Sequence, residues 1–327
     1  MRQGMSVARA YGAIAITALL LALLPLVVQS NTVINALVTA LIIALAAQGW
    51  NLLAGYGGQF SFGHAAFFGA GAYGNAILQT RYGVNAYAAM LAATAIGAVV
   101  GAGIGYLSFR SGLRGSYFAL ITLAFAEVFR IIANATPVTG GAAGTLIKLQ
   151  VSAANFQFAS RAIYFWIMLA LVIAAMLLTR GIERSRFGAY LVAVRENQDA
   201  AAALGVDTLG VKLRAMTLSA AMTALAGAFY VQYFLFVDSS IAFGTWISIE
   251  ALLAPIIGGL GTVFGPLLGA LALHFLGEFA KAVAGRVPGI DLALFGILLV
   301  LIIAFARDGL QGLLTRLSRL RRVRRPA

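Results

Sequence analysis

The sequence predicts an all-α, polytopic membrane protein, and three observations support this fold class. Hydrophobic residues make up 61% of the 327 residues and charged residues only 10%, whereas soluble domains average about 45–50% apolar and about 25% charged residues. The mean hydropathy is +0.94. The apolar runs are continuous over about twenty residues, the length with which a helix crosses a bilayer. A membrane β-barrel would instead show alternating segments of about ten residues.

Polar residues, glycines and prolines divide the chain into apolar segments, each of which is a candidate span. These segments are residues 11–29, 32–54, 60–80, 86–109, 115–134, 161–180, 213–236, 246–258, 263–283 and 290–306. The segment 246–258 is short for a bilayer core of about 30 Å, and it ends at Pro255 and the glycine-rich stretch 258–261. We therefore expect about 8–10 transmembrane segments, with a broken or re-entrant helix pair near 246–283.

The basic residues predict the orientation of the bundle. The chain carries 23 Lys and Arg against 10 Asp and Glu, a net charge of +13. If the N-terminus is inside and the segments alternate, 17 basic residues fall inside and 6 fall outside. Because inside loops are enriched in Lys and Arg, both termini are expected inside. The loop 135–160 is then outside, and the loop 181–212 and the basic tail 307–327 are inside. The tail is expected to contact anionic lipid and not nucleic acid.

Two groups of glycines predict different local structures. Gly97, Gly101 and Gly105 repeat every four residues, which favours close packing against another helix. The run Gly55–His64 is different, because it combines helix-breaking glycines with polar side chains. It therefore predicts an irregular segment.

No sequence pattern supports enzymatic chemistry. The chain has no cysteine, and its two histidines, His64 and His274, are far apart in sequence. A zinc site needs three or four ligands, so no metal is expected. The Walker A and GxSxG motifs are absent as well. We expect no catalytic residues, and no cofactor bound by this chain.

A few polar residues lie within apolar segments, where their cost in lipid makes them candidates for a translocation path. They are Gln59, Ser61, His64, Glu127 and Glu250. Two of them have simpler interpretations. Glu127 is three residues from Arg130, so the two side chains share a helix face and are expected to pair. His64 is expected to be packed and hydrogen-bonded. Glu250 has no such partner, and it must face protein or water.

The inside loop 181–212 is the most polar stretch before the C-terminal tail. Residues Asn197–Leu204 are strong helix formers with polar residues at the start, and Gly205 follows them. Such start and stop signals predict a short helix. This helix could be part of an ordinary ordered loop, or it could be a surface on which another protein docks.

Several motifs resemble one family of transporters. Asp199-Ala-Ala followed by Gly205 is similar to the EAA-x-x-x-G pattern of the coupling loop in ABC importer permeases, with Asp in place of Glu. The surrounding segments resemble the permease subunits of branched-chain amino-acid ABC importers, in the same order. They are Asn51–His64, Gly115–Phe125, Thr139–Gly141, Phe187–Asn197, Ala202–Val206 and Ile257–Pro266. The resemblance covers about residues 35–305, and the longer external loop favours the LivM-type over the LivH-type subunit.

This resemblance implies a partnership and a location. The chain would be a single transmembrane permease domain over residues 1–327 in the bacterial inner membrane. It would pair with a second homologous permease and bind two ATP-binding cassette subunits, which would bind and hydrolyse the ATP. A periplasmic substrate-binding protein would contact the outer side, so that the loop 135–160 is periplasmic. The residues implied in coupling to the ATPases are Arg195, Glu196, Asn197, Asp199, Ala200, Ala201 and Gly205.

Two alternatives remain open at this point. Permeases of urea and short-amide importers look similar, and the sequence offers no pocket by which to choose the cargo. A less favoured alternative is an ion-coupled secondary carrier, because broken helices with glycine turns also occur in that class. A carrier has no need of a coupling loop.

Overall fold

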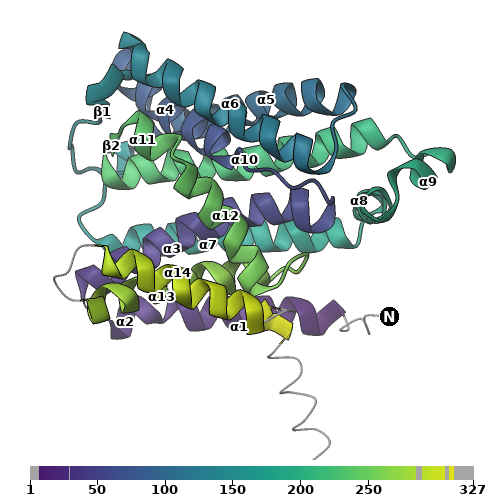
Figure 1. The fold of residues 1–327 in the computed structure, drawn as a ribbon. Coiled ribbons are helices and arrows are strands. Elements are labelled where there is room, and N and C mark those ends of the chain that lie inside the picture. The colour runs from purple at the N-terminus through teal and green to yellow at the C-terminus, as the bar shows by residue number, and fades with distance from the viewer. Residues whose placement is uncertain (1–6, 29, 285–288, 306–308, 313–327) are drawn as a thin grey trace, which may run out of the picture.

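The computed structural model describes residues 7–28, 30–284, 289–305 and 309–312. Most of this chain is helical (Figure 1). The long helices are α1 (Val7–Ala22), α3 (Asn31–Trp50), α4 (His64–Tyr82), α5 (Ala86–Arg110), α6 (Gly115–Ala135), α7 (Arg161–Glu183), α10 (Thr208–Phe234), α12 (Thr245–Gly258), α13 (Gly265–Ala284) and α14 (Ile290–Phe305). The shorter ones are α2 (Leu24–Val27), α8 (Arg186–Glu196), α9 (Gln198–Ala203) and α11 (Ser239–Ala242), with a π-helix, η1 (Asn51–Tyr56), after α3.

The predicted polytopic helix bundle is confirmed. Seven helical segments of the described chain are long and apolar enough to cross a membrane, and Tyr11–Val27 is a shorter apolar helix. Each apolar segment expected from the sequence contains a helix. The strands are two residues long each: β1 (Thr145–Leu146) pairs antiparallel with β2 (Phe236–Val237). The fold is therefore all-α in its essentials.

Successive long helices run in alternating directions, so connecting segments gather at two ends of the bundle (Figure 1). One end, here called the loop end, carries the start of α1, the α5–α6 connection, and α8 with α9. The opposite end carries β1 and β2. This arrangement matches the alternation on which the orientation was predicted. The predicted basic tail 307–327 lies outside the described residues except for 309–312.

Helix α10 lies in the centre of the bundle against α3, α4 and α5. Its neighbours approach closely because the contact positions are glycine and alanine. A Cβ atom placed on Gly97 would lie 2.2 Å from the Cβ of Ala224, and one on Gly101 would lie 2.2 Å from the Cβ of Ala220. The close packing predicted for the Gly97–Gly105 repeat is confirmed, and it allows van der Waals contact between backbones.

The predicted break near 246–283 lies at residues 259–264, between α12 and α13. Gly259 and Gly261 there have φ angles of +136° and +64°, which glycine adopts at low cost. Helix α12 has only 14 residues, but α11 and α12 together form a 20-residue candidate span. Near the end of α3, the side chain of Gln48 donates a hydrogen bond to the carbonyl of Val263 at 2.7 Å. The turn 259–264 therefore lies beside the end of α3.

Candidate functional site

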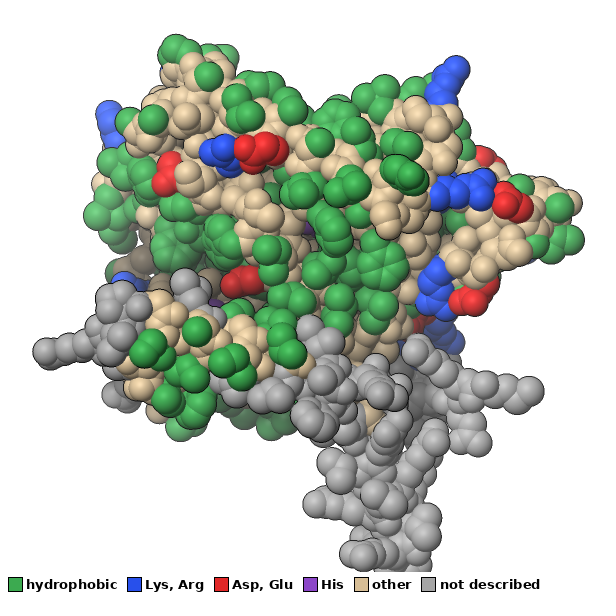
Figure 2. All heavy atoms as spheres, viewed as in Figure 1, with side chains coloured by type: hydrophobic (Ala, Val, Ile, Leu, Met, Phe, Trp, Pro, Cys, Tyr) green, Lys and Arg blue, Asp and Glu red, His purple; other side chains and the backbone are tan. Residues whose placement is uncertain are grey.

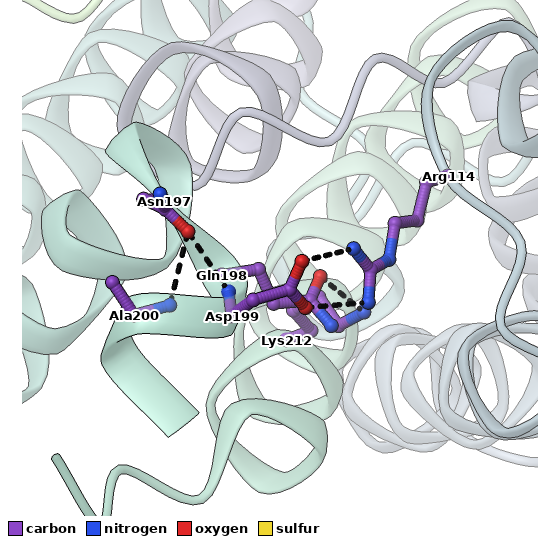
Figure 3. Close-up of polar contacts among 6 residues, drawn as sticks. All are labelled: Arg114, Asn197, Gln198, Asp199, Ala200 and Lys212. Carbon is purple, nitrogen blue, oxygen red and sulfur yellow. Dashed lines mark hydrogen bonds and ion pairs between the residues drawn. The ribbon is translucent and has the colours of Figure 1, made fainter. Parts of the chain in front are cut away.

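The short helix α9 forms as the sequence predicted, and side-chain capping explains where it starts. Asn197 is the N-cap residue, and its Oδ1 accepts hydrogen bonds from the backbone N–H groups of Asp199 at 3.1 Å and Ala200 at 3.0 Å (Figure 3). These bonds satisfy two of the N–H groups that a helix start leaves without partners. Gly205 follows the last turn with a φ angle of +85°, which makes it a stop signal.

Two basic side chains tie α9 to the bundle. Arg114, just before α6, donates to both carboxylate oxygens of Asp199 at 3.0 and 3.2 Å. Lys212, in the first turns of α10, donates to Oε1 of Gln198 at 3.2 Å, and its ammonium lies 4.7 Å from the centroid of the Phe109 ring. Figure 3 shows the Arg114 guanidinium directed at the carboxylate of Asp199, at the start of α9. Helix α9 is therefore docked by charged and polar contacts.

The ion pair also sets the protonation of its members. The hydrogen bonds from Arg114, together with its positive charge, lower the pKa of Asp199 below its ordinary value. The same contact raises the pKa of Arg114. Both groups therefore stay charged at neutral pH, so the contact that positions α9 is present there.

Helix α8 precedes α9 and lies on the bundle with its apolar side. Leu191 and Val194 are buried. At its end Arg195 pairs with the neighbouring Glu196 at 2.6 Å. Arg195 also donates to the backbone carbonyl of Gly55 at 2.9 Å. Among the residues implied in coupling, Arg195 thus contacts the bundle, whereas Glu196 is mainly exposed.

The outer side of α9 is exposed and partly apolar. Leu204, directly after the helix, has 87% of its surface exposed, while Ala201 on the inner side is buried. Charged side chains gather at this end of the molecule, whereas hydrophobic ones cover the middle of the face seen in Figure 2. A projecting short helix with an exposed leucine is a surface suited to a protein partner.

The polar residues near the glycine run lie between η1 and α4 and at the first residue of α4. Ser61 and His64 are fully buried, and His64 contacts Ser61 at 3.3 Å through Nδ1 and Ser219 at 2.8 Å through Nε2. Gln59 is half-buried and donates to the carbonyl of Gly57. The structure therefore places His64 as a packed, hydrogen-bonded residue between α4 and α10, in agreement with the simpler interpretation.

Glu127 and Glu250 lie on two other helices, α6 and α12. Glu127 forms the expected pair with Arg130, at 2.6 and 2.9 Å, and both side chains are partly exposed. Glu250 is half-buried, and its carboxylate makes no hydrogen bond within the part of the chain that the structure describes. The structure does not join the five path candidates into one site.

Sequence reasoning missed Arg114 and Lys212. They were counted as topology signals only, because their partners on α9 lie 85 and 14 residues away. Their positions at the ends of apolar segments were the available signal, since such residues can reach a loop that connects two spans. Among the described residues, no group of three or more His, Asp or Glu side chains is arranged to hold a metal ion.

Comparisons with known proteins agree on one family. A family model described as branched-chain amino acid transport system / permease component matches residues 32–303. The high-affinity branched-chain amino acid transport system permease protein LivM of Escherichia coli (strain K12) is 30% identical over 274 residues, which cover 76% of this chain and 63% of LivM. The chain thus covers less than two thirds of that relative's length.

Two further relatives are more distant. The permease protein LivH of Salmonella typhimurium is 25% identical over 248 residues, which cover 70% of this chain and 79% of LivH. The autoinducer 2 import system permease protein LsrC of Salmonella typhi is 33% identical over 130 residues, which cover 38% of this chain and 35% of LsrC. No solved structure matches the chain. Because the family model covers most of the chain, this protein belongs to the branched-chain amino acid transport permease family, and within it the chain is similar to LivM.

Proposed function

We propose that this chain is the transmembrane subunit of an ATP-driven importer that moves branched-chain or related amino acids into the cytoplasm. It would work in the bacterial inner membrane with a second homologous permease, two ATP-binding cassette subunits and a periplasmic substrate-binding protein. ATP would be bound by the ATPase subunits. In this proposal the loop 181–212 is the cytoplasmic coupling loop and the loop 135–160 faces the periplasm.

The observation that carries this proposal is the projecting helix α9. Its start is fixed by Asn197, its end by Gly205, and its position by Arg114. These contacts hold a short helix at the loop end with the exposed Leu204 at its tip. A helix docked in this way can transmit the motion of a bound subunit, because it moves as a unit with the elements that hold it.

The translocation path is proposed to run along α6 and α12. The exposed stripe of α6 carries Leu120, Glu127, Val128 and Ile131 at helical spacing, so the Glu127–Arg130 pair lies within an outward apolar surface. Charged residues at membrane depth face protein or water because lipid disfavours them. This stripe is therefore proposed to face the second permease and the path, and the half-buried Glu250 on α12 is proposed to line the path.

The experiment is reconstitution in liposomes with two ATPase subunits, a second permease and a substrate-binding protein of such an importer, with uptake of labelled leucine as the measurement. Truncating the exposed tip with Leu204→Ala should lower ATP-dependent uptake at least about fivefold, because it removes about 1 kcal/mol or more of apolar docking surface. Binding of the ATPases, measured by co-purification, should weaken in parallel.

The matched control is Leu91→Ala on α5, which truncates another leucine that is 73% exposed but lies within the membrane helices. Its uptake should equal that of the parent protein. Normal ATP-driven uptake by Leu204→Ala would contradict the role of α9. Uptake by this chain alone, driven by an ion gradient and indifferent to ATP, would establish a secondary carrier instead. Uptake of urea or short amides in place of leucine would change the cargo and keep the mechanism.

A further inference from the structure

We propose that Arg195 is the residue that links the coupling loop to the turn between α12 and α13, acting through the π-helix η1. This inference rests on the proposed function, and it assigns to Arg195 a role different from contact with an ATPase. Arg195 is a positioning residue in this proposal. It would carry a displacement of α8 into the membrane helices, where the turn 259–264 would respond.

The first step is the contact of Arg195 with the end of η1. The last carbonyl groups of a helix have no partners within the helix, so they need other donors. At the end of η1 the carbonyls of Leu53 and Ala54 accept from the backbone N–H groups of Gln59 and Gly58. The carbonyl of Gly55 accepts from Nη1 of Arg195 at 2.9 Å. The guanidinium thus caps the π-helix from a helix 140 residues further along the chain.

The backbone around this contact leaves no room for a larger residue. A Cβ atom on Gly58 would lie 2.6 Å from Cγ of Arg195, and Gly58 has a φ angle of +68°. A Cβ atom on Gly57 would lie 3.3 Å from Cδ2 of Leu191. The glycines of this run therefore let α8 lie directly on the chain that follows η1. This close approach gives a physical reason for the glycines, which sequence reasoning could only describe as irregular.

The second step leads from η1 to the turn between α12 and α13. Asn51, the first residue of η1, is fully buried. Its Oδ1 accepts from the N–H of Gly261 at 2.8 Å, and its Nδ2 donates to the carbonyl of Thr262 at 2.9 Å. One turn earlier, Gln48 donates to the carbonyl of Val263 at 2.7 Å. Three consecutive residues of the turn are thus hydrogen-bonded to α3 and η1.

The two steps meet at Gly55. A Cβ atom on this residue would lie 2.2 Å from Oδ1 of Asn51 and 2.7 Å from the backbone nitrogen of Gly261. The Cα of Gly55 therefore packs against the turn, and its carbonyl accepts the hydrogen bond from Arg195. Because these contacts are direct and buried or half-buried, α8, η1 and the turn form one continuous hydrogen-bonded unit. Such a unit provides the physical connection that a claim of coupling requires.

The absence of cysteine from the sequence allows the link to be tested with a single introduced thiol. Leu260 lies in the turn, is 38% exposed, and is not one of the residues bonded to Asn51 or Gln48. The first experiment uses Leu260→Cys in the full chain alone, in nanodiscs, and measures the rate of maleimide labelling. Adding Arg195→Met should raise this rate about fivefold, because the end of η1 loses its cap and the turn opens more often.

The matched control is Arg186→Met, which makes the same chemical change in the first turn of α8. Arg186 is exposed, and its side chain has no hydrogen bond or ion pair to any residue that the structure describes. Its labelling rate should equal that of the parent, and Arg195→Lys, which keeps a donor for the Gly55 carbonyl, should restore most of the protection. An unchanged rate in Arg195→Met overturns the proposal.

The second experiment uses the complex with its ATPases and separates docking from transmission. Nucleotide trapping should change the labelling of Leu260→Cys in the parent protein and should no longer do so with Arg195→Met. A second thiol variant, Leu204→Cys, should stay protected by the ATPases in both backgrounds. A nucleotide-dependent change at Leu260 that survives Arg195→Met overturns the link. If the ATPases do not protect Leu204→Cys in the parent protein or in Arg195→Met, the proposed function is overturned instead. The role of the Arg195 contact is then still tested by the labelling rates of the chain alone.

Discussion

Helices α9 and α10 follow each other in the chain, yet they are held in opposite ways. Helix α10 is packed on nearly all sides by α3, α4 and α5 through small residues at very close range. Helix α9 is exposed except at Gln198 and Ala201, and a few polar contacts from Asn197, Arg114 and Lys212 fix it. Helix α10 can move only if many packing contacts are distorted at once. The surface polar contacts that hold α9 can break and reform one at a time.

This difference separates the fixed part of the molecule from the part that can respond to a partner. A densely packed interface transmits strain but has little freedom of its own. A short helix on a few polar contacts can move by exchanging them. The difference also predicts that damage to the α5–α10 interface will show as loss of folding, and that damage to α9 will show as local loosening in an intact bundle.

The largest loss of stability is expected from a substitution in the interface between α5 and α10. In Gly101→Val the new side chain would start 2.2 Å from the Cβ of Ala220. Such overpacking destabilises a protein by about 1–3 kcal/mol and occasionally more. The melting temperature of the detergent-solubilised chain, followed by circular dichroism, should therefore fall by several degrees.

The same helix offers the control. Gly103 lies two residues from Gly101 on α5, and a Cβ atom there would meet nothing within 4 Å. Gly103→Val should therefore melt within about one degree of the parent, since exposed helix positions tolerate such changes within about ±0.5 kcal/mol. Equal melting temperatures for the two variants would show that the α5–α10 contact is looser than the structure has it.

The sequence alone predicted the elements of both regions because their signals are local. Apolar runs predicted the helices, the spacing of Gly97, Gly101 and Gly105 predicted a close interface, and Gly205 predicted the end of α9. The partners across these contacts could not be predicted in the same way. The bonds of Arg114 to Asp199 and of Arg195 to Gly55 join residues 85 and 140 positions apart, and no local pattern encodes such distances.

The candidate site shows the same limit. The residues implied in coupling could be named because they lie in one contiguous segment that resembles the family's motif, and Arg195 was grouped with them by its position only. Its contact with η1 depends on how α8 lies on the bundle, which is a property of tertiary packing. For Glu127 and Arg130 the pair could be predicted, because residues three apart on a helix are neighbours.

A smaller, local loss of stability is expected from substitutions of Gly205 at the end of α9. Gly205 has a φ angle of +85° with open space around it, so a side chain there meets conformational strain and no clash. Gly205→Ala should cost about 1 kcal/mol locally. Hydrogen exchange of the amides in residues 198–205 should then be about fivefold faster, with no change in α10. Gly205→Asn should exchange more slowly than the alanine variant, because Asn tolerates left-handed backbone.

The smallest effect is the pH dependence of the Arg114–Asp199 contact. Because hydrogen bonding lowers the pKa of Asp199, the pair favours the ionised carboxylate. Its contribution is fully present above the ordinary Asp pKa of about 3.9 and is lost as pH falls through the lowered pKa. The pKa of Arg114 is raised, so the guanidinium stays charged throughout this range. A nitroxide on Ala202→Cys should therefore report constant mobility from neutral pH to about pH 5 and higher mobility below the carboxyl pKa.

The variant Asp199→Asn turns this dependence into a test of what holds α9. With no carboxylate to titrate, the label should be more mobile than in the parent at neutral pH and should respond little to acid. It should not become fully mobile, because Lys212 still binds Gln198 and Asn197 still caps the helix. High salt should loosen the parent more than the variant, since it screens an exposed ion pair. A label in Asp199→Asn that is as immobile as in the parent would mean that the cap and Lys212 suffice, and that Arg114 is not needed to dock α9.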